Sequence, residues 1–360
     1  MLHSIYYITN RVFFVIKFRP FDIAKNWLTS ENRQLHLIGL FTLQNNEYFS
    51  QPRIVVIGGG HGTAAIFPEI TQITPNATAI ISMSDSGGST LRIREEFGIL
   101  PPGDAANVIT ASSQNPVIRE MNGSRLPGNG PLGGHTPKNV MLAAFMLEHG
   151  ARAGMHRFAT AMQAIGTFEP VTEQDHDLVM LDGANQVIKG EHNIDTHYIQ
   201  SSQPWISHEP PVRVTPWAES AIREADLIVY APGSPYTSQL AALCVGGVSE
   251  ALRKSEASKV LVANLANEPH DTKGWHVADY VKVLQRHGIP LDAVLYNTAT
   301  EVVSRAGKQP VDTAPERFSE IPTVQAIGAV VASFESKHVA HSSSIVGAYL
   351  LRHVFDRVYA

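Results

Sequence analysis

Cysteine is almost missing from this chain of 360 residues, in which Cys244 stands alone. An intramolecular disulfide is therefore excluded, and neither a zinc finger nor an iron–sulfur site can be built on cysteine ligands. A chain without disulfides fits a reducing compartment, so we expect a cytoplasmic protein.

Charge is also scarce. Charged residues make up 17% of the chain, against a usual ~25%, and hydrophobic residues make up 44%. This composition excludes disorder of the low-hydrophobicity type for most of the chain. The 28 Lys and Arg against 33 Asp and Glu give a net charge of -5, and no basic block occurs. Sequence-independent nucleic-acid binding needs many phosphate contacts, so we expect no nucleic-acid partner.

No apolar stretch reaches the ~18 residues that a membrane helix needs, so we expect no membrane span. The apolar N-terminal stretch from Ile5 to Phe18 is interrupted by Arg11 and Lys17, and no small-residue cleavage site follows it. We expect residues 1–52 to be a poorly ordered N-terminal extension rather than a secretory signal. A strand or helix docked on the core is the alternative.

Five short apolar runs are followed by small or polar residues. Such runs, rich in β-branched residues, are typical of parallel strands that are buried on both faces. They are Ile54–Ile57, Ala77–Met83, Leu227–Tyr230, Lys259–Ala263 and Leu291–Tyr296.

Helical patterns lie between these runs. Lys138–His149 follows Thr136 and Pro137, which are suited to an N-cap and a first helical position. Pro216–Ala225 and Trp275–Gly288 also have helical spacing. The alternation predicts an α/β fold, with a Rossmann-like, doubly wound and mainly parallel sheet.

One segment departs from this alternation. Asp177–Leu181 and Gln186–Lys189, joined by a turn, predict an antiparallel β-hairpin inserted into the α/β frame. We expect one Rossmann-like domain over residues 53–300. Residues 301–360 are predicted to be a helical tail packed on that domain, closing with an apolar helix at Ser343–Val358.

A glycine-rich loop follows the first predicted strand. Gly58, Gly59, Gly60 and Gly62 would let the backbone approach a phosphate, and the following helix would offer its N–H groups to the anion. Thr63 stands where the dinucleotide fingerprint has its third glycine, which argues against a dinucleotide oxidoreductase. A tight turn that holds no ligand is the alternative.

A second anion-binding loop is predicted after the second strand. It combines flexible backbone, hydroxyls and fixed positive charges with one carboxylate that suits a sugar hydroxyl or Mg²⁺. A capped helix start with solvated arginines is the alternative. Two such loops on neighbouring strands indicate a diphosphate ligand. The residues concerned are Asp85, Gly87, Gly88, Ser89, Arg92 and Arg94.

Further polar side chains are expected at the same edge of the sheet. Ile99–Asn107 is a rigid turn that leads into a helix, and Asp104 is either a ligand contact or the N-cap of that helix. The loop after Leu227–Tyr230 offers two hydroxyls and a tyrosine that could stack on a base or close over a sugar. The other candidate contacts are Asn107, Asn139, Gly233, Ser234, Tyr236, Thr237 and Asn264.

These motifs, in this order, resemble the family of gluconeogenesis factors (YvcK-like) and 2-phospho-L-lactate transferases (CofD-like). The resemblance covers roughly residues 53–300. It rests on Ile54–Gly62, Ser84–Ser89, Arg92–Arg94, Ile99–Asp104, Ala225–Ser238 and Asn264-Leu265.

The resemblance implies a Rossmann-like fold with its site at the carboxyl ends of the strands. Gluconeogenesis factors bind UDP-sugars such as UDP-N-acetylglucosamine and influence cell-wall synthesis and cell shape, without an established reaction. The Ile99–Asp104 run and the loop through Ser238 are more similar to this branch. A nucleotide-diphosphate ligand of UDP-sugar type is therefore the expected partner, and a homodimer is left open.

The alternative branch consists of magnesium-dependent transferases, which move a phospholactyl group from a nucleoside-diphosphate donor to a deazaflavin precursor. In that reading Asp85 would be the catalytic and metal-binding carboxylate. No cofactor is expected beyond this Mg²⁺. Whether the chain catalyses a reaction stays open.

The chain also departs from the gluconeogenesis-factor pattern. Asp85-Ser86 replaces a pair of aspartates, and His61 stands where threonine is usual. Pro137-Lys138-Asn139 replaces a serine-glycine-asparagine run, and Asn267–Thr272 only partly matches the run after Asn264. The lost carboxylate weakens the expectation of tight Mg²⁺ binding, because a diphosphate donor relies on such oxygens for charge neutralisation.

Overall fold

The computed structural model describes two parts of the chain, which are residues 1–50 and 51–360 by their internal contacts. In the first part, β1 (His3–Thr9) and β2 (Val12–Phe18) form an antiparallel hairpin. The rest of the predicted N-terminal extension lies outside the described residues. These residues are 3–9, 12–18 and 52–350, without 121–122, 184–185, 200, 202, 306–307, 336–337, 342–345 and 348.

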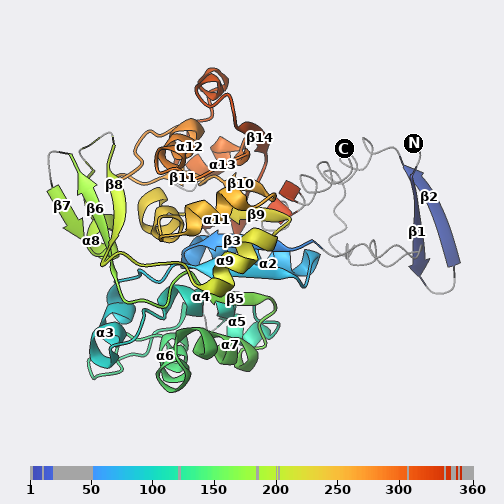
Figure 1. The fold of residues 1–360 in the computed structure, drawn as a ribbon. Helices are drawn as coiled ribbons and strands as arrows, with labels where there is room; N and C mark the ends of the chain where they lie inside the picture. The colour runs from blue at the N-terminus through green and yellow to red at the C-terminus, as the bar shows by residue number, and fades with distance from the viewer. Residues whose placement is uncertain are drawn as a thin grey trace. The chain divides into compact units, whose positions relative to one another are not determined.

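A seven-stranded sheet forms the centre of residues 51–360 (Figure 1). All of its neighbouring strands are parallel, in the order β14-β12-β10-β9-β3-β4-β5, which confirms the predicted doubly wound α/β fold. The strands are β3 (Ile54–Gly58), β4 (Ala77–Ile81), β5 (Thr167–Pro170), β9 (Leu227–Tyr230), β10 (Ser258–Val262), β12 (Ala293–Asn297) and β14 (Gln325–Ala329).

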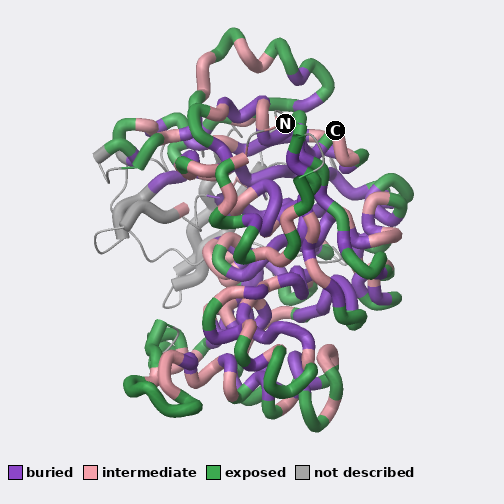
Figure 2. Tube along the Cα trace, turned by 90° about the vertical axis from the view of Figure 1, so that its left-hand side faces the viewer, coloured by how far each residue is buried: buried purple, intermediate pink, exposed green. Residues whose placement is uncertain are grey.

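The five predicted strands are all present, and the two that were missed are the edges of the sheet. Strand β5 contains Glu169 and Pro170 within four residues, and β14 is mostly exposed. Strand β5 therefore lacks the continuous apolar run by which the inner strands were recognised, whereas β14 lies in an apolar stretch that was included in the predicted helical tail. The inner strands need that run because both of their faces are buried (Figure 2).

Alternate side chains of the inner strands enter two separate hydrophobic layers. In β3, Ile54 and Val56 pack into one layer, whereas Val55 and Ile57 pack into the other. The first layer is covered by α2 (Gly60–Ile73), α4 (Gly103–Ala111), α6 (Pro137–His149) and α7 (Ala151–Ala161). The second is covered by α9 (Pro216–Glu224), α10 (Ala241–Leu243), α11 (Val248–Lys254) and α12 (Val277–Arg286).

The predicted helices begin and end close to the expected residues. Thr136 caps α6 by accepting a hydrogen bond from the Asn139 amide, as the Thr-Pro pair predicts. Helix α12 is shorter than predicted because His276 and Asp279 form a capping box at its start. The remaining helices are α3 (Gly88–Phe97), α5 (Pro116–Glu120), α8 (Glu191–Asp195) and α13 (Thr300–Arg305), with a π-helix at Pro235–Leu240 and a 3₁₀ turn at Pro315–Glu320.

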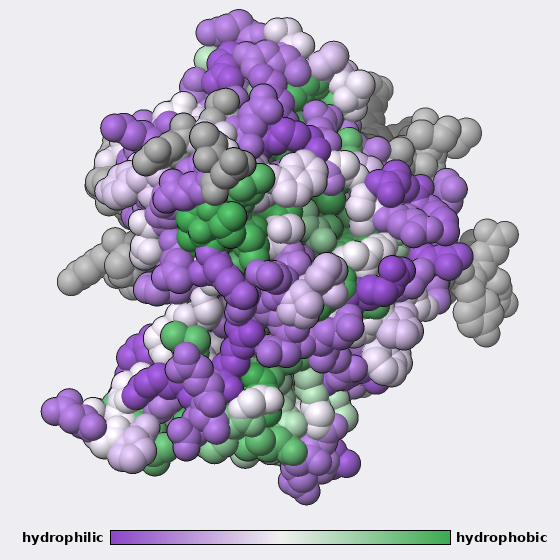
Figure 3. All heavy atoms as spheres, turned by 60° about the vertical axis from the view of Figure 1, so that its left-hand side comes forward, coloured by the Kyte–Doolittle hydropathy of each residue, from purple (hydrophilic) through white to green (hydrophobic). Residues whose placement is uncertain are grey.

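The inserted hairpin is confirmed, and it has a third strand. Strands β6 (Asp177–Asp182) and β7 (Gln186–Lys189) are antiparallel, and β8 (Trp205–Glu209) pairs with the other edge of β6. Val187, Leu181 and Trp205 are aligned across the three strands and exposed, and hydrophobic surface is visible on this side of the molecule (Figure 3). Helix α8 connects β7 to the segment before β8.

The prediction of a helical tail over residues 301–360 is corrected for the described residues. Strand β14 completes the main sheet, and β13 (Gln309–Pro310) pairs with β11 (Ala266–Asn267). Strands β15 (Ala332–Glu335) and β16 (His338–His341) form a further antiparallel pair. These strands are two to five residues long, too short for a clear strand pattern in the sequence. The expected helix at Ser343–Val358 lies largely outside the described residues, among which no helix is long and apolar enough to cross a membrane.

The order in which strands are added to the sheet reverses between β3 and β9, which are parallel neighbours. Strand β3 is followed in sequence by β4 on one side, whereas β9, its neighbour on the other side, comes after the whole first half of the domain. Connections leave such a pair in opposite directions and open a crevice at the carboxyl ends of the strands. The loops after β3 and β9 are therefore neighbours at this switch point.

We expect Gly62→Ala to destabilise the fold. A Cβ at this position would lie 1.6 Å from the carbonyl oxygen of Pro232, so the two loops would have to separate. Overpacking of this kind costs about 1–3 kcal/mol, to be measured by urea unfolding. Gly130→Ala, at an exposed glycine with no atom near its Cβ position, is the matched control. Equal stability of both variants would contradict the close packing.

Candidate ligand-binding site

The loop after β3 is packed against both the loop after β9 and the start of α4. A Cβ at Gly58 would lie 2.9 Å from the Cβ of Ala231, and one at Gly59 would lie 3.2 Å from both Asp104 Oδ2 and Ser238 Oγ. Helix α2 begins at Gly60, as the glycine-rich pattern predicts. The first and third predicted loops therefore do meet.

The loop after β4 contacts the start of α4, which in turn contacts the loop after β3. A Cβ at Gly103 would lie 2.3 Å from both Asp85 Oδ2 and Thr90 Oγ1, and Asp85 Oδ1 accepts a hydrogen bond from the Gly87 amide at 2.9 Å. The next residue, Asp104, contacts the Gly60 region of the first loop. The start of α4 therefore joins the first loop to the second.

Asp104, in the first turn of α4, lies against Gly60 at the N-terminus of α2. Burial, followed by the charges of Asp85 and Glu191, raises its pKa well above the ordinary value, although a hydrogen bond from the Gly60 amide acts in the opposite direction. The raised pKa reduces the negative charge that Asp104 brings to the glycine-rich loop. The alternative role of Asp104 as an N-cap is not observed, because Pro102 is the cap residue of α4.

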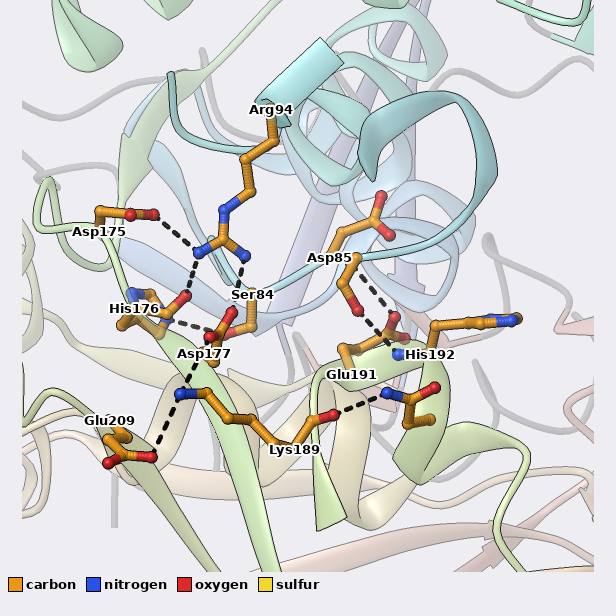
Figure 4. Close-up of polar contacts among 12 residues, drawn as sticks. Ser84, Asp85, Arg94, Asp175, His176, Asp177, Lys189, Glu191, His192 and Glu209 are labelled. Atoms are coloured by element: carbon orange, nitrogen blue, oxygen red, sulfur yellow. Dashed lines mark hydrogen bonds and ion pairs between the residues drawn. The ribbon is translucent and has the colours of Figure 1, made fainter. Parts of the chain in front are cut away.

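Two acids at this edge, Glu191 and Asp195, were missed by the sequence analysis. Glu191 Oε2 accepts a hydrogen bond from the Ser86 amide at 3.4 Å, and Ser86 Oγ accepts one from the His192 amide at 2.9 Å (Figure 4). Burial, with Asp85 and Asp195 nearby, raises the pKa of Glu191 to about 8. No local motif marks these acids, because only the folding of the inserted sheet brings α8 to the loop.

The third loop is held by polar side chains from the next strand. The Gly233 amide donates to Asn264 Oδ1 at 2.7 Å, and Ser234 Oγ donates to Asp271 Oδ2 at 3.0 Å. Ser234 Oγ also accepts hydrogen bonds from the amides of Tyr236 and Thr237, which caps the π-helix. Gly233, Ser234 and Asn264 therefore lie together, as predicted.

Tyr236 and Thr237 differ in position. The Tyr236 ring is 1% exposed and packs edge-to-face on Trp275, so its ring is part of the core rather than a surface on which a base could stack. Thr237 Oγ1 donates to Asp195 Oδ1 at 3.3 Å, which connects the third loop to α8.

The remaining predicted residues gather around the N-termini of α3 and α6. Asn139 Nδ2 donates to Ser89 Oγ at 3.4 Å, and Ser89 Oγ is hydrogen-bonded to His135 at 2.8 Å. Asn107 Oδ1 accepts a hydrogen bond from Lys138, whose pKa burial and Arg125 lower to about 8. Gly88, at the first position of α3, is exposed.

The two arginines of the second loop are engaged by other parts of the protein. Arg92 donates to the Gly133 carbonyl at 2.8 Å. Arg94 donates to Asp175 and Asp177 and to the His176 carbonyl, at distances between 2.8 and 3.0 Å (Figure 4). Arg94 therefore attaches the inserted sheet to α3, and its charge is already paired.

The acids at this edge do not form a complete metal site. Among the described residues, no three His, Cys, Asp or Glu side chains are placed to hold a metal ion. Mg²⁺ often takes one or two protein carboxylates and fills its shell with waters and phosphate oxygens. Asp85 alone fits such a partial site, which a diphosphate ligand would complete.

Comparisons with known proteins agree on one family. The model of the family described as 2-phospho-L-lactate transferase CofD matches residues 54–329. The gluconeogenesis factor of Listeria monocytogenes is 34% identical over 257 residues, which are 70% of this chain and 79% of the relative, and that of Listeria innocua has the same values. A crystal structure of a Bacillus halodurans protein, 26% identical, superposes with a TM-score of 0.77 over 84% of this chain and 99% of its own.

We expect stability to fall as pH rises through the pKa of Glu191. A carboxyl with a pKa raised from 4.5 to about 8 stabilises the fold fully below the lower value, and this contribution is lost as pH rises through the higher one. Melting temperatures from about pH 5 to about pH 9 should therefore decline less in Glu191→Gln than in the wild type. Glu219→Gln, on exposed α9, is the control. Parallel curves for wild type and Glu191→Gln would refute the raised pKa.

Proposed function

The chain belongs to the CofD and gluconeogenesis-factor family, and we propose that it binds a nucleoside-diphosphate ligand of UDP-sugar type at the carboxyl edge of its sheet. Through this ligand it acts on cell-wall synthesis and cell shape in the cytoplasm, as a gluconeogenesis factor. The observation that carries the proposal is the contact between the glycine-bearing loops after β3 and β9 at the switch point of the sheet.

The chemistry of these loops supports a diphosphate. Gly59 has an extended backbone that any residue can adopt, so the missing side chain serves close approach rather than an unusual conformation. The N-terminus of α2 attracts an anion, and the raised pKa of Asp104 reduces the repulsion that a phosphate meets there.

A specific observation keeps the transferase alternative in view. Asp85 and Asp104 lie next to each other at the point where a diphosphate would bind. A Mg²⁺ held by Asp85 and the diphosphate would neutralise the charge that develops on the leaving phosphate. The loops would orient the donor, so the protein's contribution to a phospholactyl transfer would be positioning.

We expect Gly59→Val to abolish ligand binding while the fold is retained. The added side chain would fill the space that a phosphate needs, but it meets only the tips of Asp104 and Ser238, which can move. Calorimetry with UDP-N-acetylglucosamine should give no heat for Gly59→Val. Gly130→Val, at an exposed glycine, should bind like the wild type. Unchanged affinity of Gly59→Val would mean that the loop is only a turn.

Asp85→Asn separates the two candidate functions. The amide still accepts the hydrogen bond from Gly87 but no longer carries the charge that Mg²⁺ needs. In a transferase, turnover of a deazaflavin precursor with Mg²⁺ should fall about 100-fold, since removal of a charge-stabilising group has effects of that order. A UDP-sugar-binding protein without turnover should keep its affinity within a few-fold. If the wild-type protein turns over the deazaflavin precursor, its assignment as a UDP-sugar-binding protein without catalysis is overturned.

A further inference from the structure

Helix α8 bridges two of the strand-end loops. At its first residue, Glu191 Oε2 accepts a hydrogen bond from the Ser86 amide in the loop after β4. At its last residue, Asp195 Oδ1 accepts one from Thr237 Oγ1 in the loop after β9. Residues four apart lie on one face of a helix, so this face of α8 spans the distance between the loops after β4 and β9.

The carboxyl of Glu191 is within electrostatic reach of acids on three sides. Asp85 and Asp195 raise its pKa, and Glu191 in turn raises that of Asp104. Asp85 follows β4, Asp104 contacts the loop after β3, and Asp195 contacts the loop after β9. Glu191 therefore lies where the three loops converge, although it belongs to the inserted sheet.

A buried polar atom at the same edge indicates that a ligand supplies a further hydrogen bond. Among the described residues, Asn139 Oδ1 is one of the buried side-chain atoms without a hydrogen-bond partner, and Asn139 is 5% exposed. The Asn139 amide reaches Thr90, whose hydroxyl shares the space over Gly103 with Asp85. Buried polar atoms are rarely left unpaired without a functional reason.

We propose that Glu191, together with Asp195, binds the hydroxyl groups of the sugar on the diphosphate ligand and so selects nucleotide-sugars over nucleotides. This inference rests on the proposed function. The two side chains are one helical turn apart, a spacing of ~5–6 Å that matches hydroxyls on opposite sides of a sugar ring. Because Glu191 is protonated at neutral pH, it can donate one hydrogen bond and accept others, as a hydroxyl-binding group must.

The test is calorimetric titration of the full chain with UDP-N-acetylglucosamine and with UDP, each in the presence of Mg²⁺ and of EDTA. Glu191→Ala should lose about 10-fold or more of its affinity for the sugar nucleotide, while UDP binding stays within about 2-fold. Glu191→Gln keeps a donor and an acceptor, so it should retain sugar binding within about 3-fold. Glu219→Gln is the matched control on an exposed helix.

Each other outcome overturns the inference in a recognisable way. Equal losses of UDP and sugar nucleotide in Glu191→Ala would place Glu191 at the phosphates. A defect in Glu191→Gln as large as that in Glu191→Ala, seen only with Mg²⁺, would make Glu191 a cation ligand. Unchanged binding in Glu191→Ala would exclude any contact. If the wild type binds neither compound, the proposed function fails, and the inference fails with it.

Discussion

The close approach of the loops after β3 and β9 is the constraint on which the rest of this structure depends. Any side chain at Gly62 would overlap the backbone of Pro232, and one at Gly60 would overlap Asp104. Glycine at these positions lets the two loops and the start of α4 occupy the switch point together. The side chains of Asp85 and Thr90 occupy the space in which a side chain at Gly103 would lie. The loop after β4 therefore packs against the start of α4 as well.

The electrostatics of the site follow from this packing. The amides of Gly60 and Gly233, which an anion would use, are held by the side chains of Asp104 and Asn264. Burial, together with the mutual repulsion of Asp85, Asp104 and Glu191, raises the pKa values of Asp104 and Glu191. These shifts lower the negative charge at this edge, which favours the approach of a phosphorylated ligand.

The sequence predicted the inner sheet because β3, β4, β9, β10 and β12 are buried on both faces and consist of apolar runs. It missed β5 and β8, which contain polar residues, and β14, whose apolar residues were included in the predicted helical tail. The same limit applies to the site. Gly59, Asp85 and Gly233 follow recognisable strands, whereas Glu191 and Asp195 reach the crevice only through tertiary contacts of α8. The burial of Tyr236 likewise depends on Trp275, which no local pattern places beside it.

The central claim is that the glycine-bearing loops bind one ligand together. The most direct measurement follows the backbone amide signals of Gly59–Thr63 and Gly233–Thr237 by NMR during titration with UDP-N-acetylglucosamine. We expect both sets of amides to shift with one common affinity, and the Ser86–Ser89 amides to shift with them. Shifts confined to a single loop, or found only at other surfaces of the protein, would contradict the account.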